Sequence, residues 1–214
     1  MAVEIVIFGE RLRLAGFDHQ RGRPAVDRAT LTLLSLAGLR RGDRLLVLGE
    51  GTGVLALAAA KIIGEANVVV ICRSPEAAAW IRENAALNGL SGMAVVEGKG
   101  FTALRGQYFS VIIGRPSFQV DFPTARRLIN GAHRHLLLGG RCLFLVQRRL
   151  WYERRIRAVF GNVQRGRVRP YHILRAEKRS ETRPRRFGRI LRRRPARGED
   201  RFGVGGLSPL LGGK

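Results

Sequence analysis

The sequence predicts an α/β protein in which a mostly parallel sheet carries helices on both faces. Short, almost entirely apolar runs alternate with helical segments through most of the 214 residues, as in strands buried between two layers of helices. Hydrophobic residues make up 45% of the chain, enough for a sizeable core. A glycine-rich turn joins the first buried run to the helix that follows it.

The N-terminal segment predicts a β-hairpin. Residues 3–16 alternate between apolar and polar side chains on both sides of Gly9, which is typical of two short strands and a tight turn. Residues 17–30 are rich in turn-forming side chains, and residues 31–39, "LTLLSLAGL", are helical in pattern.

The central segment predicts alternating strands and helices. Ser74 suits an N-cap, Pro75 the first helical position, and Asn88-Gly89 the end of one helix, whereas Gly139-Gly140 would stop a later one. The strands are predicted at 45–48, 68–72, 94–97, 109–113 and 142–146, with a closing hairpin from 163–168 and 171–175. The helices are predicted at 54–63, 74–88, 124–138 and 151–160.

Composition changes after Lys178. Residues 179–214 are rich in Arg, Pro and Gly and carry a net charge of +8. Such a segment cannot bury a core of its own, and we expect it to be disordered until it binds a partner. The predicted organisation is a hairpin at 1–16, an α/β domain at 17–178 and a basic tail at 179–214.

Charge points to a polyanionic partner. Lys and Arg number 39 against 16 Asp and Glu, a net charge of +23, and nucleic acid is the usual partner of so basic a protein. Codon bias could explain why 35 of the 39 are Arg, but not why acids are few.

Cys72 and Cys142 lie in apolar runs, which favours buried free thiols over a disulfide or a metal site. With no signal-peptide pattern and no apolar run of 18 residues, we expect a cytoplasmic protein that binds neither metal nor membrane.

The segment "LLVLGEGTGVLALAAA", residues 45–60, is the first candidate for a binding site. Gly49, Gly51 and Gly53 would let a ligand approach backbone N–H groups at a helix N-terminus. A purely structural tight turn explains the same pattern as well, so the motif alone is weak.

Four segments in order resemble class I S-adenosylmethionine (SAM)-dependent methyltransferases of the small-domain type, similar to the enzymes that methylate guanine N2 in 16S rRNA. They are "RLLVLGEGTGVLAL", "VVVICRSPEAAAWIRENAALNGL", "FSVIIGRPSF" and "LINGAHRHLLLGGRCLFLV". The resemblance covers residues 17–178 and implies a Rossmann-like, seven-stranded sheet, SAM as cofactor and rRNA as partner. It implies cofactor contacts at Gly49, Glu50, Gly51, Gly53, Cys72, Arg73 and Lys99, and a catalytic loop at Arg115, Pro116, Ser117 and Phe118.

The chain departs from the family pattern at the polar positions. The acids that hold the SAM ammonium and ribose are replaced by Val47 and by Cys72, which Arg73 follows, and Lys99 stands at an adenine contact. Arg115 replaces the loop Asn, and Ser117 replaces the second Pro. A guanidinium has no acceptor for a guanine amine, and SAM is itself cationic. These residues favour impaired SAM chemistry.

Three functions remain open. The first is an RNA-binding, rRNA- or ribosome-associated pseudoenzyme without methyl transfer. The second is an active SAM-dependent rRNA guanine-N2 methyltransferase in which Glu50 replaces a lost acid and Phe118 stacks on a flipped base. The third is a polyanion binder without preference for RNA, whose binding fades in salt. Oligomeric state is left open.

Basic side chains are the candidates for RNA contact, because Arg pairs with phosphates in bidentate fashion. They are Arg148, Arg149, Arg154, Arg155 and Arg157, and in the tail Arg185, Arg186, Arg192, Arg193 and Arg194. We expect the neighbouring aromatic residues to pack in the core. Asp27 and Asp43 flank turns and are expected to be structural, and His133 and His135 to lie on the surface or face RNA.

Overall fold

The computed structural model describes residues 2–15, 26–49, 52–98, 100–116 and 120–181. The chain divides into two units, 1–184 and 185–214, and every described residue belongs to the first. No helix in these described ranges is both long and apolar enough to cross a membrane.

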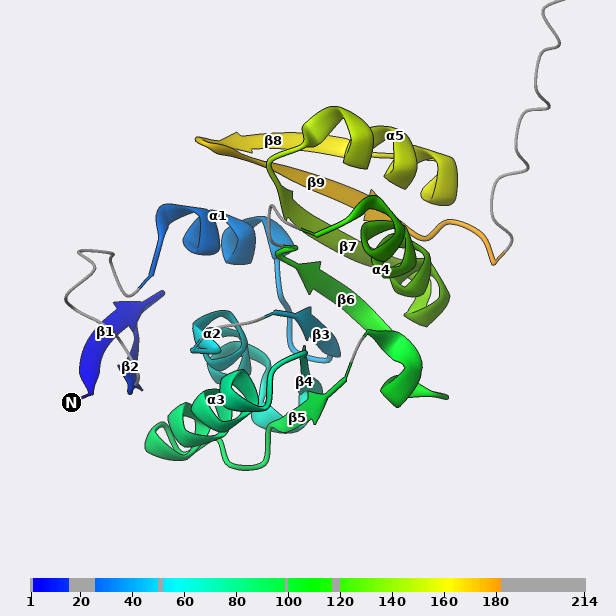
Figure 1. Ribbon diagram of the computed structural model, residues 1–214. Helices are drawn as coiled ribbons and strands as arrows, with labels where there is room; N and C mark the ends of the chain where they lie inside the picture. Colours follow the sequence, from blue (N-terminus) through cyan, green and yellow to red (C-terminus); the bar gives the residue numbers. More distant parts are fainter. Residues whose placement is uncertain (1, 16–25, 50–51, 99, 117–119, 182–214) are drawn as a thin grey trace, which may run out of the picture. The chain divides into compact units, whose positions relative to one another are not determined.

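A seven-stranded sheet forms the centre of the fold (Figure 1). Its strands are β3 (Leu45–Leu48), β4 (Val68–Cys72), β5 (Ala94–Glu97), β6 (Phe109–Gly114), β7 (Leu136–Val146), β8 (Gln164–Val168) and β9 (Tyr171–Glu177). They are arranged in the order β5-β4-β3-β6-β7-β9-β8. The first five run parallel, and β9 is antiparallel to both β7 and β8. The predicted parallel sheet with a closing hairpin is confirmed.

Helices cover both faces of the sheet (Figure 1). They are α1 (Arg28–Ala37), α2 (Val54–Ile63), α3 (Pro75–Leu87), α4 (Phe122–His135) and α5 (Arg149–Phe160), with short 3₁₀ turns η2 (Glu65–Asn67) and η3 (Phe101–Leu104). Side chains alternate between two cores, so that Val47 packs with α1, α2 and α3, whereas Leu46 and Leu48 pack with η3, α4 and α5.

Cap residues set the ends of α3 as the sequence predicts. The Ser74 hydroxyl accepts a hydrogen bond from the Ala77 amide at 3.3 Å, Pro75 begins the helix and Asn88 ends it. Cys72 and Cys142 are buried free thiols, as expected, and burial raises the pKa of Cys142 to about 12.

Two asparagines attach the N-terminal hairpin to the domain. The hairpin consists of β1 (Val3–Ile7) and β2 (Glu10–Leu14), and β2 packs on α2 and α3. Buried Asn84 accepts from the Ala15 amide at 2.6 Å and donates to the Thr52 carbonyl at 3.0 Å, while Asn88 bonds both backbone groups of Arg13. The Asn-x-x-x-Asn pattern of α3 is therefore a structural link between the hairpin and the glycine turn.

The predicted helix 124–138 is too long. The helix α4 ends at His135, and Leu136 already begins β7. Gly139 has φ +77° and donates to the Lys178 carbonyl at 2.8 Å, and Gly140 accepts from the Lys178 amide. A Cβ on Gly140 would lie 2.8 Å from the Leu137 carbonyl oxygen. The two glycines therefore lie in the irregular first part of β7 and do not end a helix.

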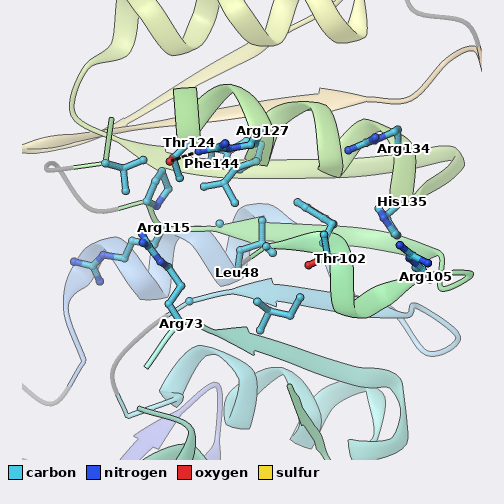
Figure 2. Close-up of a pocket in the computed structure, with 18 residues that line it drawn as sticks. Leu48, Arg73, Thr102, Arg105, Arg115, Thr124, Arg127, Arg134, His135 and Phe144 are labelled. Atoms are coloured by element: carbon cyan, nitrogen blue, oxygen red, sulfur yellow. Dashed lines mark hydrogen bonds between the residues drawn. The ribbon is translucent and has the colours of Figure 1, made fainter. Parts of the chain in front are cut away.

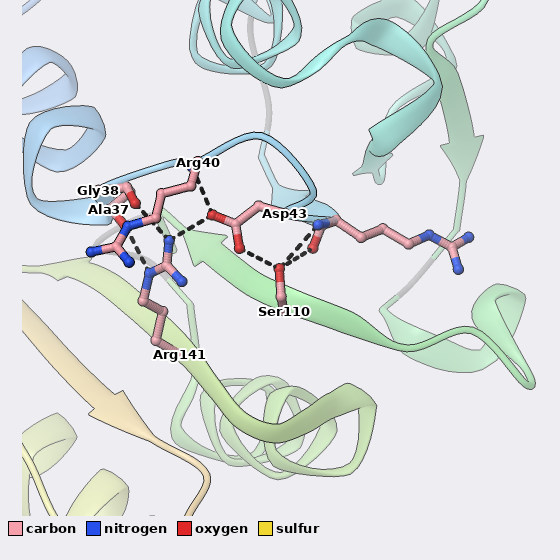
Figure 3. Close-up of polar contacts among 7 residues, drawn as sticks. Ala37, Gly38, Arg40, Asp43, Ser110 and Arg141 are labelled. Carbon is pink, nitrogen blue, oxygen red and sulfur yellow. Dashed lines mark hydrogen bonds and ion pairs between the residues drawn. The ribbon is translucent and has the colours of Figure 1, made fainter.

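A partly buried polar network joins the end of α1 to the sheet (Figure 3). Asp43 accepts from the Ser110 hydroxyl at 2.7 Å and the Arg141 guanidinium at 2.8 Å. Arg141 also donates to the carbonyls of Ala37 and Gly38, at 2.7 and 2.8 Å. Burial favours a raised pKa for Asp43, but the bonds from Arg141 and Ser110 outweigh it and lower the pKa. The expected structural role of Asp43 is confirmed.

Candidate functional site

A cavity of about 600 Å³ lies between η3 and α4, which we call the η3–α4 cavity (Figure 2). Its floor is apolar and includes Leu48, Ile71, Phe101 and Phe144, all at least nine-tenths buried. The volume is typical of a ligand site. The cavity begins where β3, β4 and β6 end, which is where ligands of parallel α/β sheets bind.

Glycines shape this end of the sheet. Gly49 lines the cavity and donates its amide to the Ile71 carbonyl at 3.2 Å. Gly53 caps α2 with φ +78°, and a Cβ there would lie 3.0 Å from Ile81. Gly114 also lines the cavity, and a Cβ there would come within 2.8 Å of the Phe144 ring. Packing of the strands and of α2 against α3 therefore requires these glycines whether or not a ligand binds.

Cationic side chains surround the apolar floor. Arg73 and Arg115 lie at the carboxyl ends of the strands, and Arg105, Arg134 and His135 lie at the opposite end (Figure 2). Arg127 stands between them on α4, 3.2 Å from the Thr124 hydroxyl. No Asp or Glu is among the described residues that line the cavity. The described lining therefore favours anions.

Arg115, at the position of the family's loop Asn, is paired with α1. Its guanidinium forms an ion pair with Asp27, donates to the Thr30 hydroxyl at 3.2 Å and lies over the Tyr171 ring at 5.4 Å. Asp27 is the N-cap of α1 and accepts from the Thr30 amide at 2.7 Å. Partial burial opposes ionisation of Asp27, yet the bonds from Thr30 and Arg115 lower its pKa. Asp27 is thus structural, as expected.

The positions of the family's two acids lie in the core. Val47 and Cys72 are 6% and 1% exposed and pack on the face of α1, α2 and α3, away from the η3–α4 cavity. The Cys72 thiol lies 3.8 Å from the Val96 carbonyl oxygen. Arg73, the next residue, does line the cavity. Of the predicted cofactor contacts, the structure therefore brings Gly49 and Arg73 to the cavity and buries Cys72.

Of the predicted catalytic loop, Pro116 lines the cavity beside Arg115. Several other predicted site residues lie outside the described ranges. The residues that are not described are Glu50, Gly51, Lys99, Ser117 and Phe118, and the tail arginines Arg185, Arg186, Arg192, Arg193 and Arg194.

The predicted arginine cluster on α5 divides into two kinds of residue. Arg149 and Arg157 contact Glu153 at 2.8 and 3.4 Å, and Arg155 donates to Asn130 of α4 at 2.8 Å. Arg148, Arg154 and Arg157 are exposed, with Arg148 over the Phe122 ring at 5.4 Å. The exposed members are the better candidates for RNA contact.

The aromatic residues of this segment pack inward as predicted. Tyr152 and Phe160 are buried, and Trp151 stacks on Phe122 with ring centres 4.7 Å apart. Burial raises the pKa of Tyr152 to about 12.

The expectation of a surface position is wrong for His133. This residue is 4% exposed and meets the Phe160 ring edge-on at 5.0 Å, because it lies on the face of α4 that packs on α5. His135 is partly buried, stacks on Phe101 at 5.0 Å, and its Nδ1 lies 2.9 Å from the Gln107 carbonyl oxygen.

The residues at the end of the cavity opposite Arg73 and Arg115 are not predicted from the sequence. Arg105 and Phe101 follow β5 in a stretch without regular pattern, so nothing local links them to α4. A signal exists on α4, where Arg127 and Arg134 are seven residues apart and therefore share one face of the helix.

Comparison with known proteins places the chain in a family. The model of the family described as "Methyltransferase small domain" matches residues 22–175. The ribosomal RNA small subunit methyltransferase C of Sodalis glossinidius is 33% identical over 166 residues, covering 74% of this chain and 47% of that protein. The release factor glutamine methyltransferase of Deinococcus radiodurans is 41% identical over 106 residues, 49% of this chain and 36% of that protein.

A solved relative shares the fold. A T. thermophilus 16S rRNA guanine-N2 methyltransferase, in complex with AdoMet and guanosine, aligns with a TM-score of 0.71 at 27% identity over 84% of this chain and 50% of its own. The chain thus spans about half the length of the first relatives it matches. The strand order, the glycine turn and the family match agree, and the chain belongs to the methyltransferase small domain family, with its Rossmann-like fold.

Proposed function

We propose that this protein is an rRNA- or ribosome-associated RNA-binding member of the methyltransferase family that does not itself transfer methyl groups, and that it acts in the cytoplasm. One observation carries the proposal: five arginines and no described carboxylate line the η3–α4 cavity, which begins at the carboxyl ends of the strands. Such a lining attracts phosphate and repels a cationic cofactor.

The described residues do not fit SAM. Its sulfonium and ammonium groups are positive, and its ribose hydroxyls are donors that need an acceptor. Val47 and Cys72 supply no carboxylate, and the side chain of Glu97, beyond Cys72 at the edge of the sheet, is paired with Arg82 at 2.9 Å. Loss of a ribose carboxylate removes two charge-assisted bonds of about 1.5–3 kcal/mol each. A micromolar ligand has only about 8 kcal/mol in all, so the expected SAM affinity is millimolar.

The charge of the chain supports RNA as the partner. The net charge is +23, and the exposed Arg148 and Arg154 add to the cationic surface of the folded part. We also propose that the chain consists of a hairpin at 1–16, a domain at 17–178 and a basic tail at 179–214. The tail, with Arg185, Arg186, Arg192, Arg193 and Arg194, adds phosphate contacts that carry no sequence information.

An active SAM-dependent rRNA methyltransferase is the second candidate. It is favoured by the membership of the family and by the relative that was solved with AdoMet and guanosine. In that case Gly49 would lie along the cofactor, and Glu50, outside the described residues, would supply the missing charge.

Calorimetric titration of SAM into the nucleic-acid-free protein separates the two candidates. The proposal expects no binding below millimolar SAM and no methyl transfer to rRNA. Micromolar binding together with methyl incorporation would overturn it in favour of the enzyme.

A second measurement tests the RNA half of the proposal. Binding of a 16S rRNA fragment is followed from 0.05 to 0.2 M salt, with a polyanion such as heparin as control. Retention of the RNA at about 0.2 M while heparin is lost supports RNA recognition. Equal loss of both would leave only a general polyanion binder.

A further inference from the structure

We infer that the η3–α4 cavity holds a short single-stranded stretch of RNA, with bases on its apolar floor and phosphates at its two arginine-bearing ends. This inference rests on the proposed function, and it names the place where the strand binds. The site differs from the exposed arginines of α5 and from the tail.

The first support is the distribution of charge along the cavity. Arg73 lies at one end, beside Arg115, whose charge is already paired with Asp27, and Arg105 and Arg134 lie at the other end, with apolar side chains between them (Figure 2). Both ends attract phosphate, because guanidinium groups pair with phosphate oxygens. A ligand with a single phosphate would use only one end, whereas a nucleic acid strand uses both.

The second support is length. From Thr124 to His135 the cavity follows eleven steps of α4, about 16 Å at 1.5 Å per residue. Stacked nucleotides repeat about every 3.4 Å along one strand, so this length matches about five of them, of which a cavity of about 600 Å³ encloses only a part.

The third support is the floor. Phe101 and Phe144 line the cavity together with Leu48 and Ile71. Strand-binding grooves combine a cationic track with apolar or aromatic surfaces on which bases stack. The short η3, Phe101–Leu104, borders the cavity, and the four floor residues are 0–8% exposed, so that a base would contact only the part of each side chain that faces the cavity.

Charge reversal at the far end of the cavity tests the inference in the full-length chain. The probe is fluorescein-labelled penta-uridylate, and the variant is Arg105→Glu with Arg134→Glu, two exposed side chains. The matched control is Arg41→Glu with Arg126→Glu, which changes the charge equally at exposed positions that do not line the cavity. Arg126 neighbours the cavity residue Arg127 on the same helix.

We expect the cavity variant to lose at least tenfold in affinity and the control no more than about threefold. Equal losses would overturn the inference in favour of diffuse attraction. Displacement of the pentamer by UMP at an affinity equal to its own would overturn it in favour of a small-molecule anion site. If the protein binds a 16S rRNA fragment but not the pentamer, the inference fails and the proposed function stands; if it binds neither, both fail.

Cross-linking distinguishes RNA bound in the cavity from RNA bound by the basic tail, residues 179–214. The pentamer carries 4-thiouridine at its central position, and cross-linked peptides are mapped by mass spectrometry. Cross-links in residues 100–105 and 124–135 support the inference. Cross-links confined to residues 179–214 contradict it.

Discussion

Two Asp–Arg pairs hold the opposite ends of α1 to the sheet, and they differ in burial. At the C-terminal end Asp43 pairs with Arg141, with side chains 11% and 17% exposed. At the N-terminal end Asp27 pairs with Arg115, with side chains 35% and 40% exposed. The first pair lies at the amino ends of the strands, and the second lies beside the η3–α4 cavity.

The two pairs differ in their relation to the η3–α4 cavity, because Arg115 lines it and Arg141 does not. Arg141 does not line the η3–α4 cavity, and its bonds to Asp43, Ala37 and Gly38 hold the end of α1 to β7. Arg115 is the residue that the sequence resemblance aligns with the family's loop Asn, and its ion pair with Asp27 holds it against α1. A donor-only group held in this way offers no acceptor to a guanine amine.

Removal of the charge at the buried pair has the largest expected effect on stability. Asp43→Asn leaves Arg141 buried without its anion, and we expect a loss of about 2–3 kcal/mol in the free energy of unfolding. Urea unfolding measures this loss. A loss below about 1 kcal/mol would show that the two pairs are equivalent.

The effect of Asp43→Asn should also depend on pH. The pKa of Asp43 is lowered in the folded chain, so its charge adds stability above the unfolded value of about 3.9. That contribution is lost as pH falls through the folded pKa. We expect the difference between wild type and variant to be constant from pH 5 to 7, to begin to shrink below about pH 4, and to vanish only below the folded pKa. A difference that does not shrink at all as the pH falls below about 4 would assign the effect to packing rather than to charge.

At the exposed pair, two substitutions separate the cap from the ion pair. Asp27→Ala removes the N-cap and the charge, and we expect a loss of about 1–2 kcal/mol. Asp27→Asn keeps a side chain that caps a helix equally well and removes only the charge, so we expect at most about 1 kcal/mol. Thermal unfolding of both variants gives the difference, and equal losses would mean that the cap contributes nothing.

The sequence predicts most of the fold because local signals agree. Ser74 with Pro75, the glycine turn and the apolar runs each place an element where the structure has it. The exception at Leu136 shows the limit, since pairing of β7 with β6 and β9 overrides the helical pattern there. Local preference is a weak prior when a sheet position is available.

The candidate site is less predictable because its contacts join distant segments. The substitution of Arg115 for the loop Asn is visible in the sequence, but its partner Asp27 is 88 residues away. Arg105 and Arg134 come from two elements that only the folded sheet brings to one cavity. The family motifs lie at the carboxyl ends of the strands, so they give no indication of the opposite end of the cavity, where Arg105 and Arg134 lie.

Arg115→Asn restores the family's loop residue, and it has the smallest expected effect on stability. Asp27 keeps its bonds to Thr30, and the pair is more than one-third exposed, so we expect a loss below about 1 kcal/mol. We also expect no gain of methyl transfer, because Val47 and Cys72 still supply no carboxylate for SAM. Incorporation of labelled methyl groups into 16S rRNA is the measurement, with Arg126→Asn as the control. If Arg115→Asn alone produced methylated RNA, the pair with Asp27 would be the whole barrier to catalysis, and the cofactor would bind without those acids.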